Sequence, residues 1–277
     1  MRYVIDSNQL QSKNLRRYLS KSETNFAVLT DYVAMEAYKG DTLASIFRSM
    51  EVLCDFPDQV LVLKNTRVAC VLRGKPAGLQ RRLIDKRQTR EFPAYVRSLL
   101  AAKNGDARYL KSILDYGKDA TAHMNEMLQD AVKTGQAIED IAKFHSKEER
   151  KAFRNGGEFP PGMVDKVVKN VLHIAAQVFH QHPNITRIPR YEELPNTFIF
   201  RCSLCMYLLA LDWAARGGIR GASAEKLRND TIDMSFAAYA TYFDGLLTAD
   251  TKTSRLHQKA RIWLTGLFDC NLSGSLL

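Results

Sequence analysis

Acidic side chains stand beside several apolar segments of this sequence. Asp6 ends a short β-rich run, Asp250 ends the run "GLLTAD", and Glu36 lies in a segment with helical spacing. In folds that alternate strands and helices, ligands bind in the crevice at the carboxyl ends of the strands. Residues that follow the strands face that crevice. We therefore expect Asp6, Glu36, Asp233 and Asp250 to meet there.

Convergent carboxylates are suited to hard divalent cations. Mg²⁺ and Mn²⁺ prefer oxygen ligands and keep several waters, so a few carboxylates form a site without histidine. Without a metal, such a cluster repels itself and its pKa values rise. Asp230 lies three residues before Asp233, so both fit one face of the first turn of an expected helix. The predicted Mg²⁺ or Mn²⁺ ligands are Asp6, Glu36, Asp230, Asp233 and Asp250.

Each of these acids also has an ordinary structural reading. Asp6 and Asp230 suit helix caps, because aspartate is favoured at that position. Asp250 suits a turn, and Glu36 suits a solvated helix face. The set is more informative than its members, because four separate acids at element boundaries of one α/β chain suggest a common site.

The charge balance is compatible with a nucleic-acid partner. The chain has 277 residues with 40 Lys and Arg against 30 Asp and Glu, a formal net charge of +10. A positive field raises the local concentration of phosphates. The segment "RGKPAGLQRRLIDKRQTR" is the best candidate for holding a phosphate backbone, and a solvated charged surface is the alternative. Its basic residues are Arg73, Lys75, Arg81, Arg82, Lys86, Arg87 and Arg90.

The order of apolar patterns predicts an α/β fold. Strand-like and helical patterns alternate from the N-terminus, and "QVLVLKN" and "RVACVLRG" supply two more strand-like runs. Residues 75–189 show helical periodicity alone and are expected to form a helical insertion or lid. Residues 1–74 and 190–277 are expected to form a three-layer α/β/α sandwich around a mainly parallel sheet, closed by a C-terminal helix.

Other features give weaker indications. Five cysteines are scattered through the chain, and Cys202 and Cys205 lie in an apolar run that reads as core packing. Arg201 and Asp212 interrupt that run, so we expect no membrane span and a cytoplasmic protein. His173 and His180 share a helical face, but no carboxylate lies at ligand spacing.

Three motifs together resemble the PIN-domain ribonuclease family. They are "VIDSN" at 4–8, "TDYVAMEAY" at 30–38 and "DMSFAAYATYFDGLLTAD" at 233–250. The resemblance covers about 1–72 and 190–268, and the last motif is the most specific. It implies that Asp6, Glu36, Asp233 and Asp250 bind the metal. It also implies that Ser7 and Asn8 line the site and that Thr248 orients the final aspartate. The long helical insertion departs from compact family members.

The resemblance implies a metal-dependent endoribonuclease that hydrolyses RNA phosphodiester bonds, with single-stranded DNA as the other substrate. A toxin, a defence effector and an RNA-processing enzyme all fit, with an inhibitory or activating protein partner or a homodimer as further expectations. The alternative is a catalytically silent PIN-like nucleic-acid-binding or regulatory module. A phosphatase with an aspartyl nucleophile is disfavoured, because Asn8 stands where such an enzyme has a second aspartate.

Overall fold

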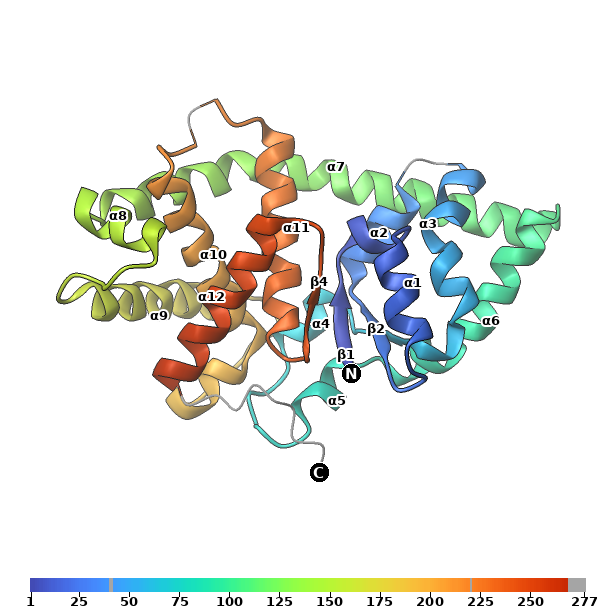
Figure 1. Cartoon of the computed structure of the whole chain (residues 1–277), viewed down its shortest axis with the longest axis horizontal. Coiled ribbons are helices and arrows are strands. Elements are labelled where there is room, and N and C mark those ends of the chain that lie inside the picture. The colour runs from blue at the N-terminus through green and yellow to red at the C-terminus, as the bar shows by residue number, and fades with distance from the viewer. Residues whose placement is uncertain (40–41, 220, 269–277) are drawn as a thin grey trace.

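Four parallel strands form the centre of the protein (Figure 1). The computed structural model describes residues 1–39, 42–219 and 221–268, with all their side chains except those of 129–134 and 268. The sheet has the order β3-β2-β1-β4, and every pairing in it is parallel. The strands are β1 (Arg2–Ile5), β2 (Phe26–Leu29), β3 (Val60–Val62) and β4 (Gly245–Leu247). The predicted α/β class with a parallel sheet is confirmed.

Helices make up most of the remaining described chain. In the first part they are α1 (Lys13–Ser20), α2 (Asp31–Tyr38), α3 (Leu43–Asp55) and α4 (Thr66–Cys70), with 3-10 turns η1 (Ser7–Gln9) and η2 (Pro57–Gln59). The middle part has α5 (Leu79–Leu83), α6 (Lys86–Lys103), α7 (Ala107–Lys143), α8 (Lys147–Asn155) and α9 (Met163–Gln181). The last part has η3 (Tyr191–Asn196), α10 (Phe198–Ala215), α11 (Ala224–Ala240) and α12 (Thr251–Phe268).

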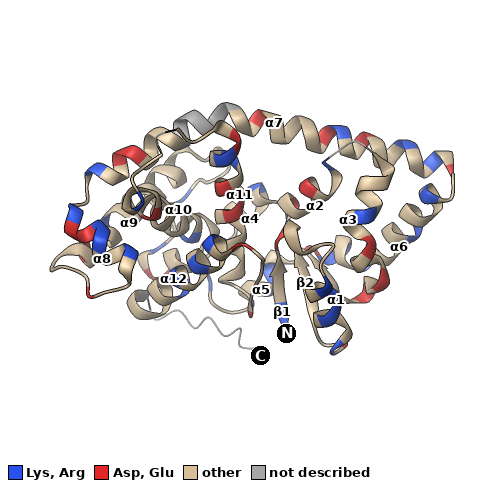
Figure 2. Cartoon of the chain, turned by 45° about the horizontal axis from the view of Figure 1, so that its top comes forward, with Lys and Arg blue, Asp and Glu red and all other residues tan. Residues whose placement is uncertain are grey.

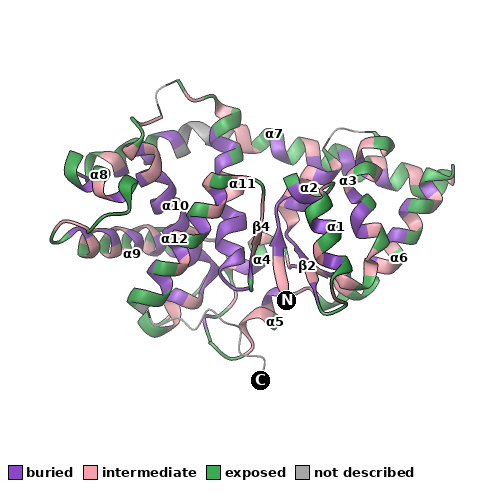
Figure 3. Ribbon diagram, in the orientation of Figure 1, coloured by how far each residue is buried: buried purple, intermediate pink, exposed green. Residues whose placement is uncertain are grey.

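Each face of the sheet has its own apolar core, because successive strand residues point to opposite sides. Val4 and Val28 pack in a cluster with residues of α9, α10, α11 and α12. Ile5, Ala27 and Leu29 pack in a second cluster with residues of α1, α2, α3 and α6. Figure 3 shows buried residues along the strands and on α10 and α11. The sheet is therefore covered by helices on both faces, which explains why most of its strand residues are apolar.

The prediction of a strand at "RVACVLRG" is wrong. It forms the short helix α4 followed by a turn. The Asn65 side chain accepts a hydrogen bond from the backbone amide of Val68 at 2.9 Å and so caps the helix. Val68 is 38% exposed, so its β-branched side chain does not pack as a strand residue would.

The expected position of Asp230 and Asp233 at a helix start is also wrong. Helix α11 begins at Ala224, and Ser223 caps it by accepting a hydrogen bond from the Lys226 amide at 3.2 Å. Both aspartates therefore lie in the second and third turns of the helix. Neither carboxylate caps the helix, and that of Asp230 contacts Trp213 and Lys252.

The helical segment from 75 to 189 is joined to both cores. Among its described residues it adds no strand to the sheet and makes only an isolated antiparallel bridge between Leu63 and Ile84. Helix α7 is 37 residues long and runs from α2 and α6 at one end to α10 and α11 at the other (Figure 1). Met124 of α7 is buried in one core and Ile138 in the other.

Helix α10 is a buried core helix. Of the described helices it alone is long and apolar enough to cross a membrane, and 72% of it is buried inside the protein. Burial raises the pKa of the Cys205 thiol to about 12, so this cysteine packs as a neutral group. The buried Arg201 guanidinium donates to the carbonyls of Pro195 and Thr241 at 2.9 and 2.8 Å. These bonds explain how the helix carries a charge in its apolar sequence.

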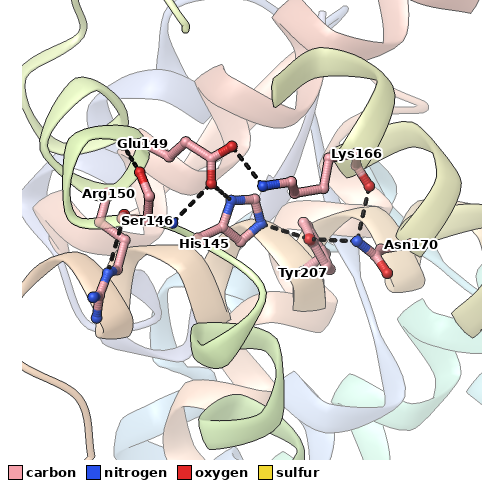
Figure 4. A network of polar contacts seen from close by, with 7 residues as sticks. All are labelled: His145, Ser146, Glu149, Arg150, Lys166, Asn170 and Tyr207. Atoms are coloured by element: carbon pink, nitrogen blue, oxygen red, sulfur yellow. Dashed lines mark hydrogen bonds and ion pairs between the residues drawn. The ribbon is translucent and has the colours of Figure 1, made fainter. Parts of the chain in front are cut away.

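A buried polar network fastens the junction of α7 and α8 to α9 and α10 (Figure 4). The His145 ring lies 3.0 Å from a Glu149 carboxylate oxygen and 2.7 Å from the Tyr207 hydroxyl. The Lys166 ammonium donates to the other Glu149 oxygen at 2.6 Å, and Asn170 donates to Tyr207 at 3.1 Å. Every buried charge in the network thus has a partner, which keeps the cost of burial low.

We predict that Glu149→Gln destabilises the protein by about 2 kcal/mol, because it breaks the ion pair with Lys166. Burial disfavours the ionised Glu149, but hydrogen bonds from Lys166 and the Ser146 amide outweigh burial and lower its pKa. A carboxyl group whose pKa is lowered in the folded state stabilises the fold at pH values above its ordinary pKa of 4.5. This stabilisation is lost as the pH falls. Urea unfolding at pH 7 and pH 4 should show that the difference in unfolding free energy between wild type and Glu149→Gln is smaller at pH 4.

Glu91→Gln is the matched control. It breaks the surface pair between Arg87 and Glu91, whose side chains are 80% and 51% exposed, and should change stability by less than about 0.5 kcal/mol. Equal effects of the two substitutions would contradict a stabilising role for the buried network.

Candidate functional site

Asp6 joins the two ends of the chain at the carboxyl edge of the sheet. Its backbone amide donates to the Leu247 carbonyl at 3.0 Å, which continues the pairing of β1 with β4. Its carboxylate is 2% exposed and accepts hydrogen bonds from the Asn8 side chain at 2.7 Å and the Thr248 hydroxyl at 2.5 Å. The first and last predicted motifs therefore meet directly.

Asn8 and Thr248 extend this link to Asp250. The Ala249 amide donates to the Asn8 side-chain oxygen at 3.0 Å, and the Asp250 amide donates to the Thr248 hydroxyl at 2.9 Å. One Asp250 carboxylate oxygen accepts from the backbone amides of Lys252 and Thr253 at 2.6 and 3.1 Å. Asp250 therefore caps the start of α12 while it lies beside Asp6.

Glu36 and Asp233 approach Asp6 from the helices on either side (Figure 2 shows acidic positions on α2 and α11 at this end of the sheet). Burial raises the pKa of Glu36, a hydrogen bond from Ser7 lowers it, and the charge of Asp6 raises it. The Ser7 hydroxyl also lies 3.4 Å from an Asp6 carboxylate oxygen. Glu36 and Asp6 are thus neighbours that share Ser7.

Asp233 lies near all four of the other acids. Burial is the largest reason for its pKa of about 8, and the charges of Asp6, Asp250, Asp230 and Glu36 raise it further. Burial also raises the pKa of Asp6, although its hydrogen bonds with Thr248 and Asn8 offset part of the effect. The structure therefore brings the other four predicted acids within electrostatic range of Asp233.

Asp230 is held by an ion pair and a hydrogen bond from two other helices. One of its carboxylate oxygens accepts a hydrogen bond from the Trp213 indole at 2.7 Å and forms an ion pair with the Lys252 ammonium. These contacts connect α10, α11 and α12. Asp230 is 7% exposed, so its charge is already balanced inside the protein.

Two cationic residues, Lys39 and Arg228, lie near the acids and were not predicted from the sequence. Burial is the main influence on Glu36, but Lys39 and Arg228 lower its pKa and so lie close to it. Arg228 is 6% exposed, and its guanidinium donates to the Asn229 side chain at 3.1 and 2.9 Å. Arg228 lies two residues before Asp230 and five before Asp233, so neither pair has the three- or four-residue spacing of neighbours on a helix, and helical spacing could not have found the arginine.

Part of the predicted nucleic-acid surface lies away from the acids. Gln80 of α5 accepts from the Arg2 guanidinium and donates to the Tyr242 carbonyl, at 3.0 and 2.6 Å. Arg2 begins β1, so α5 lies at the amino edge of the sheet (Figure 1). The predicted residues on or just before α5 are Arg73, Lys75, Arg81 and Arg82.

The rest of that surface belongs to the first turns of α6. The Asp85 amide donates to the Val62 carbonyl at 2.8 Å, which puts this end of α6 beside the outer strand β3. Lys86, Arg87 and Arg90 are exposed there, and Arg87 pairs with Glu91.

The acids suit a hard divalent cation by their chemistry, since all of their donor atoms are oxygens. A cation among them would relieve the repulsion that raises the pKa of Asp233. In the described part of the chain, however, no three acidic, histidine or cysteine side chains are arranged as a formed metal site. The carboxylates of Asp6 and Asp250 are instead held by hydrogen bonds with neighbouring groups.

No family model, curated protein or solved structure matches this chain at a significant level. The resemblance to PIN-domain ribonucleases therefore rests on the three motifs and on their arrangement.

We predict that Asp233→Asn stabilises the metal-free protein at pH 8 by about 2 kcal/mol. Between the ordinary value of 3.8 and about 8, folded Asp233 holds a proton that the unfolded chain has released. Stability from this residue therefore falls as the pH rises through that window, and asparagine removes the loss. Thermal unfolding in EDTA from pH 4 to pH 8 should show the two proteins diverging. Asp119→Asn, at an exposed acid of α7, is the control; curves for Asp233→Asn that parallel the wild type would contradict this crowding.

Asp230→Asn should destabilise the metal-free protein, whereas Asp233→Asn should stabilise it. Loss of its ion pair with Lys252 should lower the melting temperature without metal, because the Lys252 ammonium, 5.0 Å from the Trp213 ring, loses its carboxylate partner. The stabilisation by Mn²⁺ should remain, whereas Asp233→Asn should lose it. Differential scanning fluorimetry with and without Mn²⁺ measures both. If Asp230→Asn abolished the Mn²⁺ effect with a normal metal-free melting temperature, Asp230 would be a ligand and not an anchor.

Proposed function

We propose that this chain is a metal-dependent endoribonuclease with a PIN-like α/β/α core, and that Asp6, Glu36, Asp233 and Asp250 hold Mg²⁺ or Mn²⁺. The proposal rests chiefly on the hydrogen bond between Thr248 and Asp6, which joins two predicted motifs 242 positions apart. It is supported by the position of these residues at the carboxyl edge of a parallel sheet, where ligands of such folds bind. The net charge of +10 supports an anionic polymer as substrate.

The chain's own residues would divide the work at the scissile phosphodiester. Asp6, held by Asn8 and Thr248, and Asp250, held by the first turn of α12, offer fixed carboxylates. Asp233, with a pKa of about 8, keeps a proton at neutral pH until a cation displaces it. A bound Mg²⁺ or Mn²⁺ supplies an acidified water and neutralises charge on the phosphate. Arg228 adds a positive charge beside Glu36 that favours binding of the phosphate.

The helical segment 75–189 would act as a cover over one side of this site, in a cytoplasmic protein. Helix α7 contacts both α2 and α11, the two helices that carry Glu36 and Asp233. A lid that restricts access would suit a nuclease held inactive by a protein partner until it is triggered, and equally an RNA-processing enzyme that admits one substrate. The exposed Lys and Arg side chains of α6 would then contact the RNA backbone outside the acidic crevice.

A catalytically silent PIN-like module that binds nucleic acid is the second candidate. One observation favours it: the carboxylates of Asp6 and Asp250 are already held by hydrogen bonds within the protein. In that case the carboxylates would have a structural role, with Asp6 fastening β1 to β4 and Asp250 capping α12. The two candidates differ in whether the protein cleaves RNA when Mg²⁺ or Mn²⁺ is added.

A cleavage assay tests the proposal. Wild type, Asp6→Asn and Asp250→Asn are incubated with labelled linear and circular single-stranded RNA and with single-stranded DNA, in Mg²⁺, Mn²⁺ or EDTA. We expect wild type to linearise circular RNA only with metal. Each variant should lose activity on the order of 10²-fold or more, because a carboxylate at the reacting centre is removed.

The control for this assay is Asp119→Asn, which removes an exposed acid of α7 and should cleave as wild type does. Circular dichroism establishes that the variants are folded. Retained RNA binding without cleavage in any metal would contradict the nuclease and favour the silent module. Cleavage that persists in EDTA, or in folded Asp6→Asn, would contradict the metal site.

A further inference from the structure

A cavity of about 450 Å³ lies between the segment after α4 and the segment after α9. Residues 70–75 form one wall, residues 184–193 form the other, and Phe179 of α9 contributes between them. The first wall leads into α5, which contacts the start of β1 through Gln80 and Arg2. The cavity is therefore on the amino side of the sheet, whereas the acidic site is at its carboxyl edge. Its volume is in the range of small-molecule sites.

The cavity is strongly positive. Arg73 and Lys75 line it from one wall, and Arg187 and Arg190 line it from the other. All four are exposed, and Glu193 is the one acidic residue among the described lining. Arg190 has an ion pair with the exposed Glu192 at 4.0 Å, which is weak. Four cations against one carboxylate favour an anion, and arginine is well suited to bind phosphate through two parallel hydrogen bonds.

The first wall is held in place by backbone contacts. The Arg82 guanidinium donates to the carbonyls of Arg73, Lys75 and Ala77, with 3.1 Å to Arg73. Gly74 packs against the other wall so tightly that an added Cβ would lie 2.0 Å from the Glu193 carbonyl oxygen. Arg73 and Lys75 flank this glycine. Their backbone is therefore held against the second wall before any ligand binds, which reduces part of the entropy cost of binding.

The cavity also has an apolar side. Val71, Leu72, Phe179, Ile185 and Ile188 line it, together with the neutral polar groups of Asn184 and Thr186. Val71 and Ile188 are 39% and 41% exposed, so a ligand in the cavity can reach them. A ligand with an apolar ring at one end would cover them. The Cys70 thiol has a pKa raised by burial to about 11, so it adds a neutral surface and no competing negative charge.

We propose that this cavity binds a free mononucleotide, with the phosphate among Arg73, Lys75, Arg187 and Arg190 and the base against the apolar side. A nucleotide joins the two surfaces that the cavity offers, an anionic group and a flat ring. A cavity of about 450 Å³ suits one nucleotide better than a polymer, which would need a continuous groove. The inference does not depend on the proposed nuclease, because the acidic site lies at the other edge of the sheet.

Isothermal titration calorimetry of the full chain tests the assignment. The probes are the four 5′-mononucleotides AMP, GMP, CMP and UMP, the nucleoside adenosine, inorganic phosphate and a single-stranded RNA oligonucleotide. We expect at least one mononucleotide to bind one per chain, with inorganic phosphate and adenosine binding at least about tenfold more weakly. The double variant Arg73→Glu with Arg187→Glu should weaken the nucleotide about tenfold or more.

Two controls make the result specific. Lys111→Glu with Lys169→Glu makes the same charge change at exposed residues outside the cavity and should leave nucleotide binding unchanged. Asp6→Asn should also leave it unchanged, and thermal unfolding establishes that each variant is folded. The proposal is overturned if no mononucleotide binds to folded wild type or if inorganic phosphate binds as tightly. It is also overturned if only the oligonucleotide binds, or if the control variant weakens binding as much as the cavity variant.

Discussion

The hydrogen bond from Thr248 to Asp6 is the contact on which the carboxyl edge of the sheet depends. Asp6 is 2% exposed, and a buried carboxylate is costly unless its oxygens accept hydrogen bonds. Its partners come from Asn8 nearby and from Thr248 at the other end of the chain. Thr248 can supply the hydroxyl only if β4 pairs with β1 in the observed register. The requirement for these partners therefore favours the sheet order that places the acids together.

Repulsion among the acids is the second constraint, and the surrounding cations limit it. Asp230 is balanced by Lys252 and the Trp213 indole, whereas Arg228 and Lys39 reduce the cost of ionising Glu36. Burial, and then the charges of the other four acids, raise the pKa of Asp233 to about 8. An acid kept protonated at neutral pH costs little without metal and supplies a charge when a cation arrives. The protonated form is therefore most favoured at Asp233, although burial also raises the pKa values of Asp6 and Glu36.

Local sequence predicts the parts of this protein that depend on local chemistry. The strands β1, β2, β3 and β4 are short apolar runs followed by polar residues, and the predicted acids Asp6 and Asp250 follow two of them. The strand expected near Val68 is a helix, because the Asn65 cap outweighs the strand preference of valine. The partners of Asp230 come from α10 and α12, and no spacing within α11 reveals them. The basic cavity also depends on contact between distant segments, since Gly74 meets Glu193 only in the folded chain.

The helical segment 75–189 has a structural part in the acidic site that its sequence does not suggest. Glu36 belongs to α2 and Asp233 to α11, which lie on different sides of the site. Met124 of α7 packs in the same core as Val33 of α2 and Ile232 of α11, and each of these three side chains is 1% exposed. Close packing leaves little freedom between such neighbours. Helix α7 therefore fixes the separation of the two acids, so any movement of this segment as a lid would also change the geometry of the site.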